Sequence, residues 1–259
     1  MRIIYSNEEY WVWLSRCKGI GPVTANKLLD EFITARNVYD ASIDEIVCCL
    51  GISEQHAMKM MGDKSLDDAK RIIDLCEQNR VSILTKEDKK YIDNAKKLPD
   101  APVVLYYKGN LNFASELERM AIVGARRCTR DARENCIEYT RKCVKSKMAI
   151  ISGMAKGIDS YAHTVCIKEG GYTIAFVANG LDICYPAEHR ALMECIVDTG
   201  AALSEYPPQT RPDRYMFPRR NRLIAAWSNS VTVIGAGRGS GAMITAQWAE
   251  KYGRHIKYM

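Results

Sequence analysis

The chain lacks any long uninterrupted apolar run. Its apolar stretches are short, such as residues 174–178, whereas a helix that spans a membrane needs roughly 18 or more apolar residues. The chain also lacks the basic, apolar and small-residue order of a signal peptide, because its first residues run directly to Glu8 and Glu9. We therefore expect a cytoplasmic protein with no membrane partner.

Cysteines at the spacing of a metal-binding or redox motif are also missing. The ten cysteines are scattered along the chain without a single C-x-x-C pair, and such pairs are the usual sequence signature of a zinc site. This pattern predicts reduced, mostly buried cysteines that behave as small apolar residues. It predicts neither a metal site nor a redox cofactor.

The composition is that of an ordinary globular protein, with 47% hydrophobic and 26% charged residues among 259. At about 150 residues per domain, this length predicts one or two domains. Lys and Arg number 37 and Asp and Glu 31, which gives a net charge of +6. That excess is compatible with a polyanionic partner but does not require one.

The hydrophobic pattern divides the chain into two parts. Residues 7–78 show apolar spacings of three and four, which are typical of helices, with breaks at residues 19–22, Gly51 and Gly62. Further along, helical patterns alternate with short β-rich runs at residues 81–84, 103–106, 120–123, 148–151, 172–177, 202–203 and 230–234. The sequence therefore predicts an all-α domain over residues 1–80. Over residues 81–259 it predicts an α/β domain with a doubly wound, mostly parallel sheet.

A glycine hairpin stands out in the helical part. Apolar residues flank Gly19-Ile20-Gly21, an arrangement that resembles the helix-hairpin-helix motif of SAM-like domains, in which backbone N–H groups contact a DNA phosphate. A degenerate second copy follows near Gly51, where Ser53 takes the place of the second glycine. The alternative is that the glycines only permit a tight turn between two structural helices.

Three predicted strands end in turns of small residues that open helices, which is where open α/β sheets bind ligands. The residues of interest are Gly124 and Arg126 in the first turn, Ser152, Gly153, Lys156 and Gly157 in the second, and Ser240, Gly241 and Thr245 in the third. We expect the three turns to converge in space. Free N–H groups at helix N-termini favour anions there.

Two nucleotide motifs are excluded. The spacing of Gly237, Gly239 and Ala242 fits the dinucleotide fingerprint, but no acidic residue follows at the expected distance before Met259. No P-loop occurs either. Asp159 and His163 lie four residues apart and could form a metal or acid–base pair; the alternative is a helix cap and a hydrogen bond that shape the pocket.

The segment at residues 211–222 is the most basic part of the chain. It has five arginines and one acid, interleaved with Tyr215 and Phe217. Arginine binds phosphate in a planar, bidentate manner, and aromatic rings stack on unpaired bases at about 1–3 kcal/mol per base. This combination favours a single-stranded polynucleotide. The alternative is a solvated arginine loop that precedes a helix at residues 223–227.

Several motifs together resemble one family, the DNA-processing protein A (DprA/Smf) family. They are residues 152–159 with Ala162-His163, residues 180–182 with Tyr185-Pro186, residues 204–207, residues 217–224, and residues 240–246 with Gly253-Arg254. The resemblance covers about residues 81–257, and the helical part also resembles that family's helical domain.

The resemblance implies an extended Rossmann-like fold and a non-catalytic protein that binds single-stranded DNA. Such proteins act in natural transformation, where they protect incoming DNA and help to load the RecA recombinase. A homodimer through the Rossmann-like domain is also implied. Carried over by motif, the DNA site comprises Gly124, Arg126, Ser152, Gly153, Lys156, Gly157, Phe217, Arg219, Arg220, Asn221, Arg222, Ser240, Gly241 and Thr245.

The chain departs from the family pattern in two ways. Gly235 stands where the family usually has an acidic residue after a strand, and the chain stops at Met259, before the usual Pro-Gly turn. We therefore expect a short form whose sheet ends early, with less secure dimerisation and RecA contact.

Two other functions stay open. A Rossmann-like nucleotide phosphoribohydrolase uses a Pro-Gly-Gly-x-Gly-Thr-x-x-Glu segment with a catalytic glutamate, and here the comparable position is Gln247. A nucleotide-sensing module would bind a small phosphorylated ligand in the same turns, so a mononucleotide should compete with DNA.

Overall fold

A computed structural model describes residues 7–62 and 64–259. The N-terminal stretch that argued against a signal peptide begins outside these residues. The helices before the sheet are α1 (Asn7–Arg16), α2 (Pro22–Phe32), α3 (Ala35–Asp40), α4 (Ile43–Leu50), α5 (Glu54–Met61) and α6 (Asp67–Gln78). Their positions confirm the predicted all-α region and the helical hairpin, since α1 and α2 flank residues 17–21.

Side-chain caps explain where several of these short helices begin. Thr34, Ser42 and Ser53 each accept a hydrogen bond from the backbone N–H three residues ahead, which satisfies one of the free donors of a helix start. Glu45 bonds back to the Ser42 backbone and completes a capping box. Gly51 ends α4 with a left-handed backbone, which glycine adopts at little cost.

The second part of the chain forms one eight-stranded sheet in the order β1-β2-β6-β5-β4-β3-β7-β8. Its strands are β1 (Ser82–Thr85), β2 (Val104–Gly109), β3 (Arg119–Gly124), β4 (Ala149–Ser152), β5 (Thr173–Phe176), β6 (Ala201–Ser204), β7 (Ser230–Ile234) and β8 (His255–Tyr258). The six strands from β6 to β8 in this order are parallel to one another, whereas β2 is antiparallel both to β6 and to the edge strand β1. The predicted doubly wound, mostly parallel sheet is therefore confirmed.

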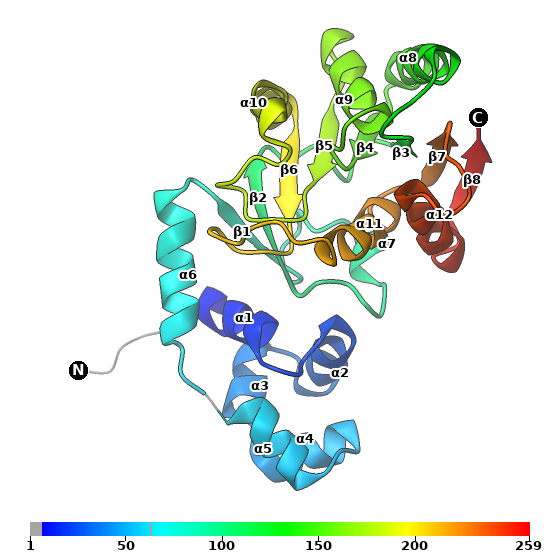
Figure 1. Ribbon diagram of the computed structural model, residues 1–259. Coiled ribbons are helices and arrows are strands. Elements are labelled where there is room, and N and C mark those ends of the chain that lie inside the picture. The colour runs from blue at the N-terminus through cyan, green and yellow to red at the C-terminus, as the bar shows by residue number, and fades with distance from the viewer. Residues whose placement is uncertain (1–6, 63) are drawn as a thin grey trace.

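Helices cover both faces of this sheet (Figure 1). They are α7 (Asp93–Lys96), α8 (Arg130–Lys145), α9 (Ile158–Lys168), α10 (Arg190–Thr199), α11 (Met216–Ala226) and α12 (Gly241–Lys251), with a 3₁₀ turn at Ala187–His189. Helices α8, α9 and α10 lie on one face, and α11 and α12 pack together on the other. Strands β4, β5 and β6 are buried along their whole length, as a sheet covered on both faces requires.

Two expectations about the C-terminal part are wrong. The sheet does not end at β7, because β8 pairs with it in parallel and Met259 continues the hydrogen bonding through its N–H to Val233. The expected helix at residues 223–227 begins earlier, at Met216. Pro218 falls in the first turn of α11, where a missing N–H leaves no intrahelical hydrogen bond unmade.

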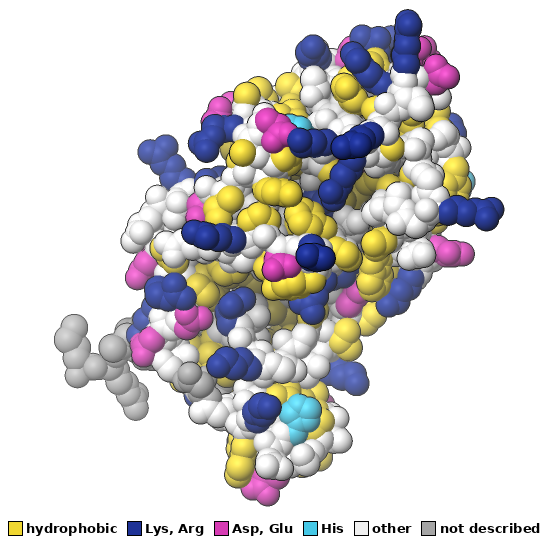
Figure 2. Space-filling view, in the orientation of Figure 1, with side chains coloured by type: hydrophobic (Ala, Val, Ile, Leu, Met, Phe, Trp, Pro, Cys, Tyr) yellow, Lys and Arg dark blue, Asp and Glu magenta, His cyan; other side chains and the backbone are white. Residues whose placement is uncertain are grey.

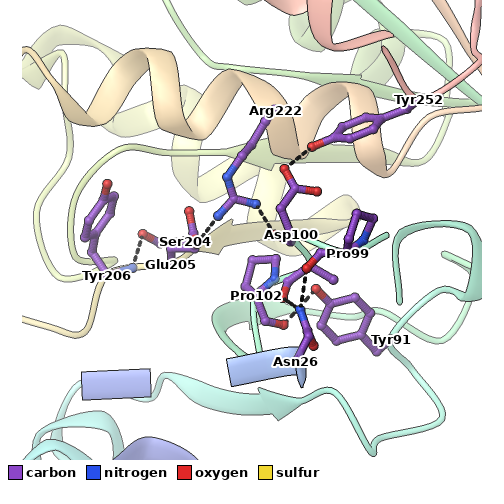
Figure 3. A network of polar contacts seen from close by, with 11 residues as sticks. Asn26, Tyr91, Pro99, Asp100, Pro102, Ser204, Glu205, Tyr206, Arg222 and Tyr252 are labelled. Atoms are coloured by element: carbon purple, nitrogen blue, oxygen red, sulfur yellow. Dashed lines mark hydrogen bonds and ion pairs between the residues drawn. The ribbon is translucent and has the colours of Figure 1, made fainter. Parts of the chain in front are cut away.

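The helical unit packs on the antiparallel edge of the sheet. Trp11 and Leu14 of α1 belong to the same buried hydrophobic cluster as Val104 and Tyr106 of β2. A buried Asn26 on α2 adds polar contacts, donating through Nδ2 to the carbonyls of Pro99 (3.1 Å) and Ala101 (2.9 Å) (Figure 3). The boundary at residue 80 separates helices from strands, but the core is continuous across it, so the division into domains stays a prediction.

The cysteines are all free, but fewer are buried than expected. Only Cys76, Cys136, Cys143 and Cys166 are buried, while four are partly buried and Cys48 and Cys195 are exposed. Among the described residues, no cluster of His, Cys, Asp and Glu is arranged to hold a metal ion. In the same part of the chain, no helix is long and apolar enough to cross a membrane.

Candidate nucleic-acid interface

The three small-residue turns meet at one edge of the sheet. Strands β4, β3 and β7 are neighbours and parallel, so the turns that follow them lie side by side. The strand order reverses at β3, and such switch points form ligand crevices at the carboxyl ends of strands. A cavity of about 610 Å³ opens here, and residues from all three turns line it. This convergence agrees with the expectation from sequence.

The predicted site residues divide into four groups. Those that line this cavity, which we call the switch-point pocket, are Gly124, Arg126, Phe217, Arg220, Asn221, Ser240, Gly241 and Thr245. Gly153 and Lys156 line a smaller adjoining cavity of about 70 Å³. Arg219 and Arg222 line a separate cleft next to the helical unit, and Ser152 and Gly157 lie in the second turn without lining any of these cavities.

Arg220 is an interior arginine rather than a solvated one. Its guanidinium donates through Nη1 to the carbonyls of Gly153 and Phe176 and through Nε to Asn221 Oδ1. Burial lowers the pKa of Arg220 to about 10, while the charge of Asp159 opposes this decrease. The guanidinium therefore stays charged at neutral pH and contributes a fixed positive charge to the wall of the pocket.

Two glycines of the second turn are explained by packing. A Cβ atom on Gly157 would come within 2.2 Å of the Ala125 carbonyl oxygen, and the backbone there has a φ of +82° that side chains disfavour. A Cβ atom on Gly153 would meet Arg220 Nη1 at 2.6 Å. Glycine at both positions lets the first two turns and α11 approach one another closely.

Ser152, Asp159 and His163 have structural partners. Ser152 is fully buried, and its Oγ donates to the Ile122 carbonyl of the neighbouring strand at 2.6 Å. Asp159 Oδ2 accepts from the backbone N–H groups of Gly153 (3.2 Å) and Ala155 (3.4 Å). The expectation that Asp159 caps its own helix is therefore wrong. Asp159 instead orders the turn that precedes this helix.

His163 lies deeper in the same region. Its Nδ1 is 2.7 Å from Thr173 Oγ1, which itself donates to the Ile150 carbonyl, so the imidazole Nδ1–H is the donor to Thr173. The pKa of His163 is lowered to about 3, mainly because the side chain is buried. The side chain is therefore neutral and has a partner different from those of Asp159, which favours the structural interpretation over an acid–base pair.

Two of the expected DNA-binding cations already have acidic partners. Lys156 forms an exposed ion pair with Glu188, and Arg222 forms a largely buried ion pair with Glu205. Arg222 also donates through Nη1 to the Asp100 carbonyl at 2.9 Å (Figure 3). An exposed ion pair breaks at little cost. The Arg222 guanidinium, in contrast, is bound both to the Glu205 carboxylate and to the Asp100 carbonyl.

Aromatic rings form one side of the switch-point pocket. Phe217 and Tyr185 lie with ring centroids 5.5 Å apart, and the Arg126 guanidinium lies 5.8 Å from the Phe217 ring. Tyr185 is 46% exposed, so part of its ring is accessible from the pocket. Planar, half-exposed rings next to arginines can stack on nucleobases.

The sequence analysis missed Tyr185 and Arg214 as site residues, and both line the pocket. The sequence offered Tyr185 only as part of a family motif. Its contact with Phe217 was not predictable, because the two residues are far apart along the chain. Arg214 was counted in the basic segment, but nothing in the sequence distinguished it from Arg211.

The charge in the switch-point pocket is predominantly positive. Arg126, Arg214 and Arg220 line it, and Asp159 is the single acidic residue among its described lining residues. On the face shown in Figure 2, Lys and Arg side chains border a central region in which hydrophobic side chains gather. An anionic ligand with apolar faces fits this combination better than a cation or a neutral metabolite.

The family described as DNA recombination-mediator protein A matches residues 82–259. The chain belongs to this family. It is 34% identical to protein Smf of Synechocystis sp. over 97% of the chain and 64% of that protein. The resemblance stated from the sequence motifs is therefore confirmed.

Solved structures of family members share the fold. DNA processing protein A from Streptococcus pneumoniae superimposes with a TM-score of 0.83 at 28% identity, covering 99% of this chain and 87% of the other. A structure from Helicobacter pylori, reported for the single-stranded DNA binding mode of its DNA processing protein A, superimposes with a TM-score of 0.62 at 31% identity. It covers 69% of this chain and 80% of the other.

The chain matches only part of each of its curated relatives. The chain spans between 55% and 64% of the length of three curated relatives, from Synechocystis, Streptococcus pneumoniae and Bacillus subtilis. What those relatives do as whole proteins can therefore be transferred to this chain only as a proposal.

Proposed function

We propose that the chain binds single-stranded DNA in the switch-point pocket and acts as a binding protein without catalysis. The observation that carries this proposal is the pocket itself, which three arginines line together with the aromatic pair Tyr185 and Phe217. Arginines supply phosphate contacts and the rings supply stacking faces that accept any base. The single-stranded DNA binding mode reported for the Helicobacter pylori relative supports the same conclusion.

Hydrolysis is disfavoured by the residues of the pocket. Gln247 stands at the position of the catalytic glutamate in phosphoribohydrolases and lies exposed on α12. The single described acid in the lining, Asp159, is buried, and its Oδ2 accepts from two backbone N–H groups of the second turn. A catalytic carboxylate would need to face the bound substrate with a free oxygen.

We place this activity in natural transformation in the cytoplasm, with RecA as the protein that receives the strand. The named relatives are DNA processing proteins, which supports a role in handling incoming DNA.

A homodimer through the Rossmann-like domain is part of the same proposal. The outer strand β8 supports it, since His255, Lys257 and Tyr258 are exposed and, among the described residues, no strand pairs with its outer edge. Sedimentation measurements across a range of protein concentrations test this dimer.

The test of DNA binding is fluorescence anisotropy of a labelled short oligothymidine over a salt series. The double variant Arg126→Ala with Arg214→Ala should bind about tenfold or more weakly per arginine removed, because each charge-assisted phosphate contact contributes about 1.5–3 kcal/mol. Arg71→Ala with Arg141→Ala is the matched control, because both arginines lie outside the pocket and pair with acids on the surface.

Competitors separate the alternatives. Duplex DNA and a mononucleotide should both displace the strand poorly. Displacement by micromolar mononucleotide would favour a nucleotide-sensing module, and release of free base from a nucleoside monophosphate would favour a hydrolase. If the variant with Arg126→Ala and Arg214→Ala binds as tightly as the control with Arg71→Ala and Arg141→Ala, the switch-point pocket is not the DNA site.

A further inference from the structure

A second cavity lies between the helical unit and the sheet. It has a volume of about 600 Å³, within the range of 300–1,000 Å³ common for ligand sites. Arg16, Gly21 and Val23 of the helical hairpin form one wall, and Tyr206, Arg219 and Lys251 belong to the opposite wall. We call this cavity the interdomain cleft.

The interdomain cleft adjoins the switch-point pocket. Pro218, in the first turn of α11, lines both cavities. The next two residues, Arg219 and Arg220, line the cleft and the pocket respectively. A chain molecule bound in the pocket can therefore continue over the start of α11 into the cleft without leaving the protein surface.

Cations outnumber acids in the cleft. Arg16, Arg219, Arg222 and Lys251 line it together with two acids, Asp100 and Glu205. The Glu205 carboxylate is paired with Arg222, and Asp100 Oδ2 accepts from the Tyr252 hydroxyl at 2.6 Å. Arg16, Arg219 and Lys251 are exposed and form no ion pair with any described carboxylate.

Aromatic surface accompanies these cations. Tyr206 and Trp248 both line the cleft and are partly exposed, and Lys251 Nζ lies 4.5 Å from the centre of the Trp248 ring. The cleft thus repeats the combination found in the switch-point pocket, unpaired cations beside planar rings. This combination suits phosphates and unstacked bases together.

We propose that the interdomain cleft binds a second segment of the same DNA strand that occupies the switch-point pocket. The strand passes over the first turn of α11, and the hairpin between α1 and α2 contacts its phosphates through Arg16. This inference rests on the proposed function, since the pocket must bind single-stranded DNA for the strand to continue into the cleft. It gives the helical unit a direct role in DNA binding.

The experiment compares oligothymidines of increasing length. The test variant is Arg16→Ala with Lys251→Ala, since both side chains are exposed and neither lines the switch-point pocket. The matched control is Lys27→Ala with Lys145→Ala, which removes the same charge from exposed positions outside both cavities. The wild-type protein should gain affinity with length until the strand fills both cavities.

The expected result is a loss confined to long strands. The cleft variant should bind the shortest oligonucleotides as the control does, and bind long strands about tenfold more weakly. A bromodeoxyuridine-substituted long strand should also photocrosslink to residues 14–23 of the wild-type protein. Equal weakening at every length, or no weakening at all, would overturn the inference.

The failure of the proposed function has a different signature. If the wild-type protein binds no oligothymidine of any length, the proposed function fails and this inference with it. If short strands bind and depend on Arg126 and Arg214 but length adds nothing, only the inference fails.

Discussion

Gly153 lies against the guanidinium of Arg220, and a Cβ atom there would meet Arg220 Nη1 at 2.6 Å. Gly153→Ala should therefore displace a buried, hydrogen-bonded arginine and lower the free energy of unfolding by about 1–3 kcal/mol. Urea denaturation measures this change. Gly241→Ala is the matched control, because a Cβ atom at Gly241 meets no atom within 4 Å, and equal stability of the two variants would contradict the packing argument.

Arg222 compensates the charge of the Glu205 carboxylate, which would otherwise be buried without a partner. Arg222→Ala should lower the free energy of unfolding by about 3–5 kcal/mol, the usual cost of breaking a buried ion pair from one side. Adding Glu205→Gln should recover part of the loss, because the neutral amide needs no counter-charge. A double variant as unstable as the single one would show that Arg222 acts through its bond to the Asp100 carbonyl instead.

The pH dependence of the Arg222→Ala variant follows from Glu205. Burial raises the pKa of Glu205, and the charge of Arg222 opposes that increase, so removing Arg222 should raise the pKa further. The folded variant then holds a proton that the unfolded chain releases above about pH 4.3. Its stability should therefore fall as the pH rises from that value through the folded pKa, relative to the wild-type protein. Thermal unfolding at several pH values checks the sign.

Residue types in the site were predictable, but their partners were not. The sequence identified Arg220 and Arg222 as cations next to Phe217, and general rules connect such cations with phosphate. Their burial depends on Phe176, Glu205 and Asp100, which are distant in sequence. No local pattern distinguishes an arginine that faces a ligand from one that binds the protein's own carbonyls.

At the scale of elements, the contact between α2 and the sheet unit depends on Asn26. Its Nδ2 donates to two carbonyls, and its Oδ1 accepts from Lys86 Nζ at 2.6 Å. Asn26→Ala should lower the free energy of unfolding by about 1–3 kcal/mol, since buried polar groups lose their partners. It should also speed hydrogen exchange in α1 and α2.

The control for this prediction is Asn37→Ala. Asn37 is exposed and donates through Nδ2 only to the nearby Phe32 carbonyl, so its loss should change stability by less than about 0.5 kcal/mol. If Asn26→Ala leaves exchange in α1 and α2 at the wild-type rate, the hydrophobic core alone holds the helical unit on the sheet.

The elements themselves were predictable where their pattern was strong. Seven strands were found near their observed positions because each is a β-rich run between turn signals. The eighth, β8, was missed because only Ile256 is even partly buried in it, which leaves a weak hydrophobic signal. The early start of α11 was missed because Pro218 and three nearby arginines are typical of a loop, whereas the tertiary packing of Met216 and Leu223 favours a helix.

At the scale of the whole molecule, the two units work as one surface if the strand crosses from the pocket to the cleft. The arrangement depends on a continuous core, since α1 shares a buried cluster with β2. The hydrophobic pattern along the chain predicted both units. It could not predict the cleft between them, because a cavity between two units depends on how they pack and not on either pattern alone.

The salt dependence of binding distinguishes local phosphate contacts from the overall charge of +6. Each phosphate neutralised on a single strand contributes about −0.7 to the slope of log K against log salt. Removing Arg126 and Arg214 together should therefore make the slope shallower by about 1.4. Arg71→Ala with Arg141→Ala removes the same net charge from surface ion pairs outside the pocket and should leave the slope unchanged. If both double variants change the slope equally, long-range attraction by the net charge, rather than contact in the switch-point pocket, accounts for DNA binding.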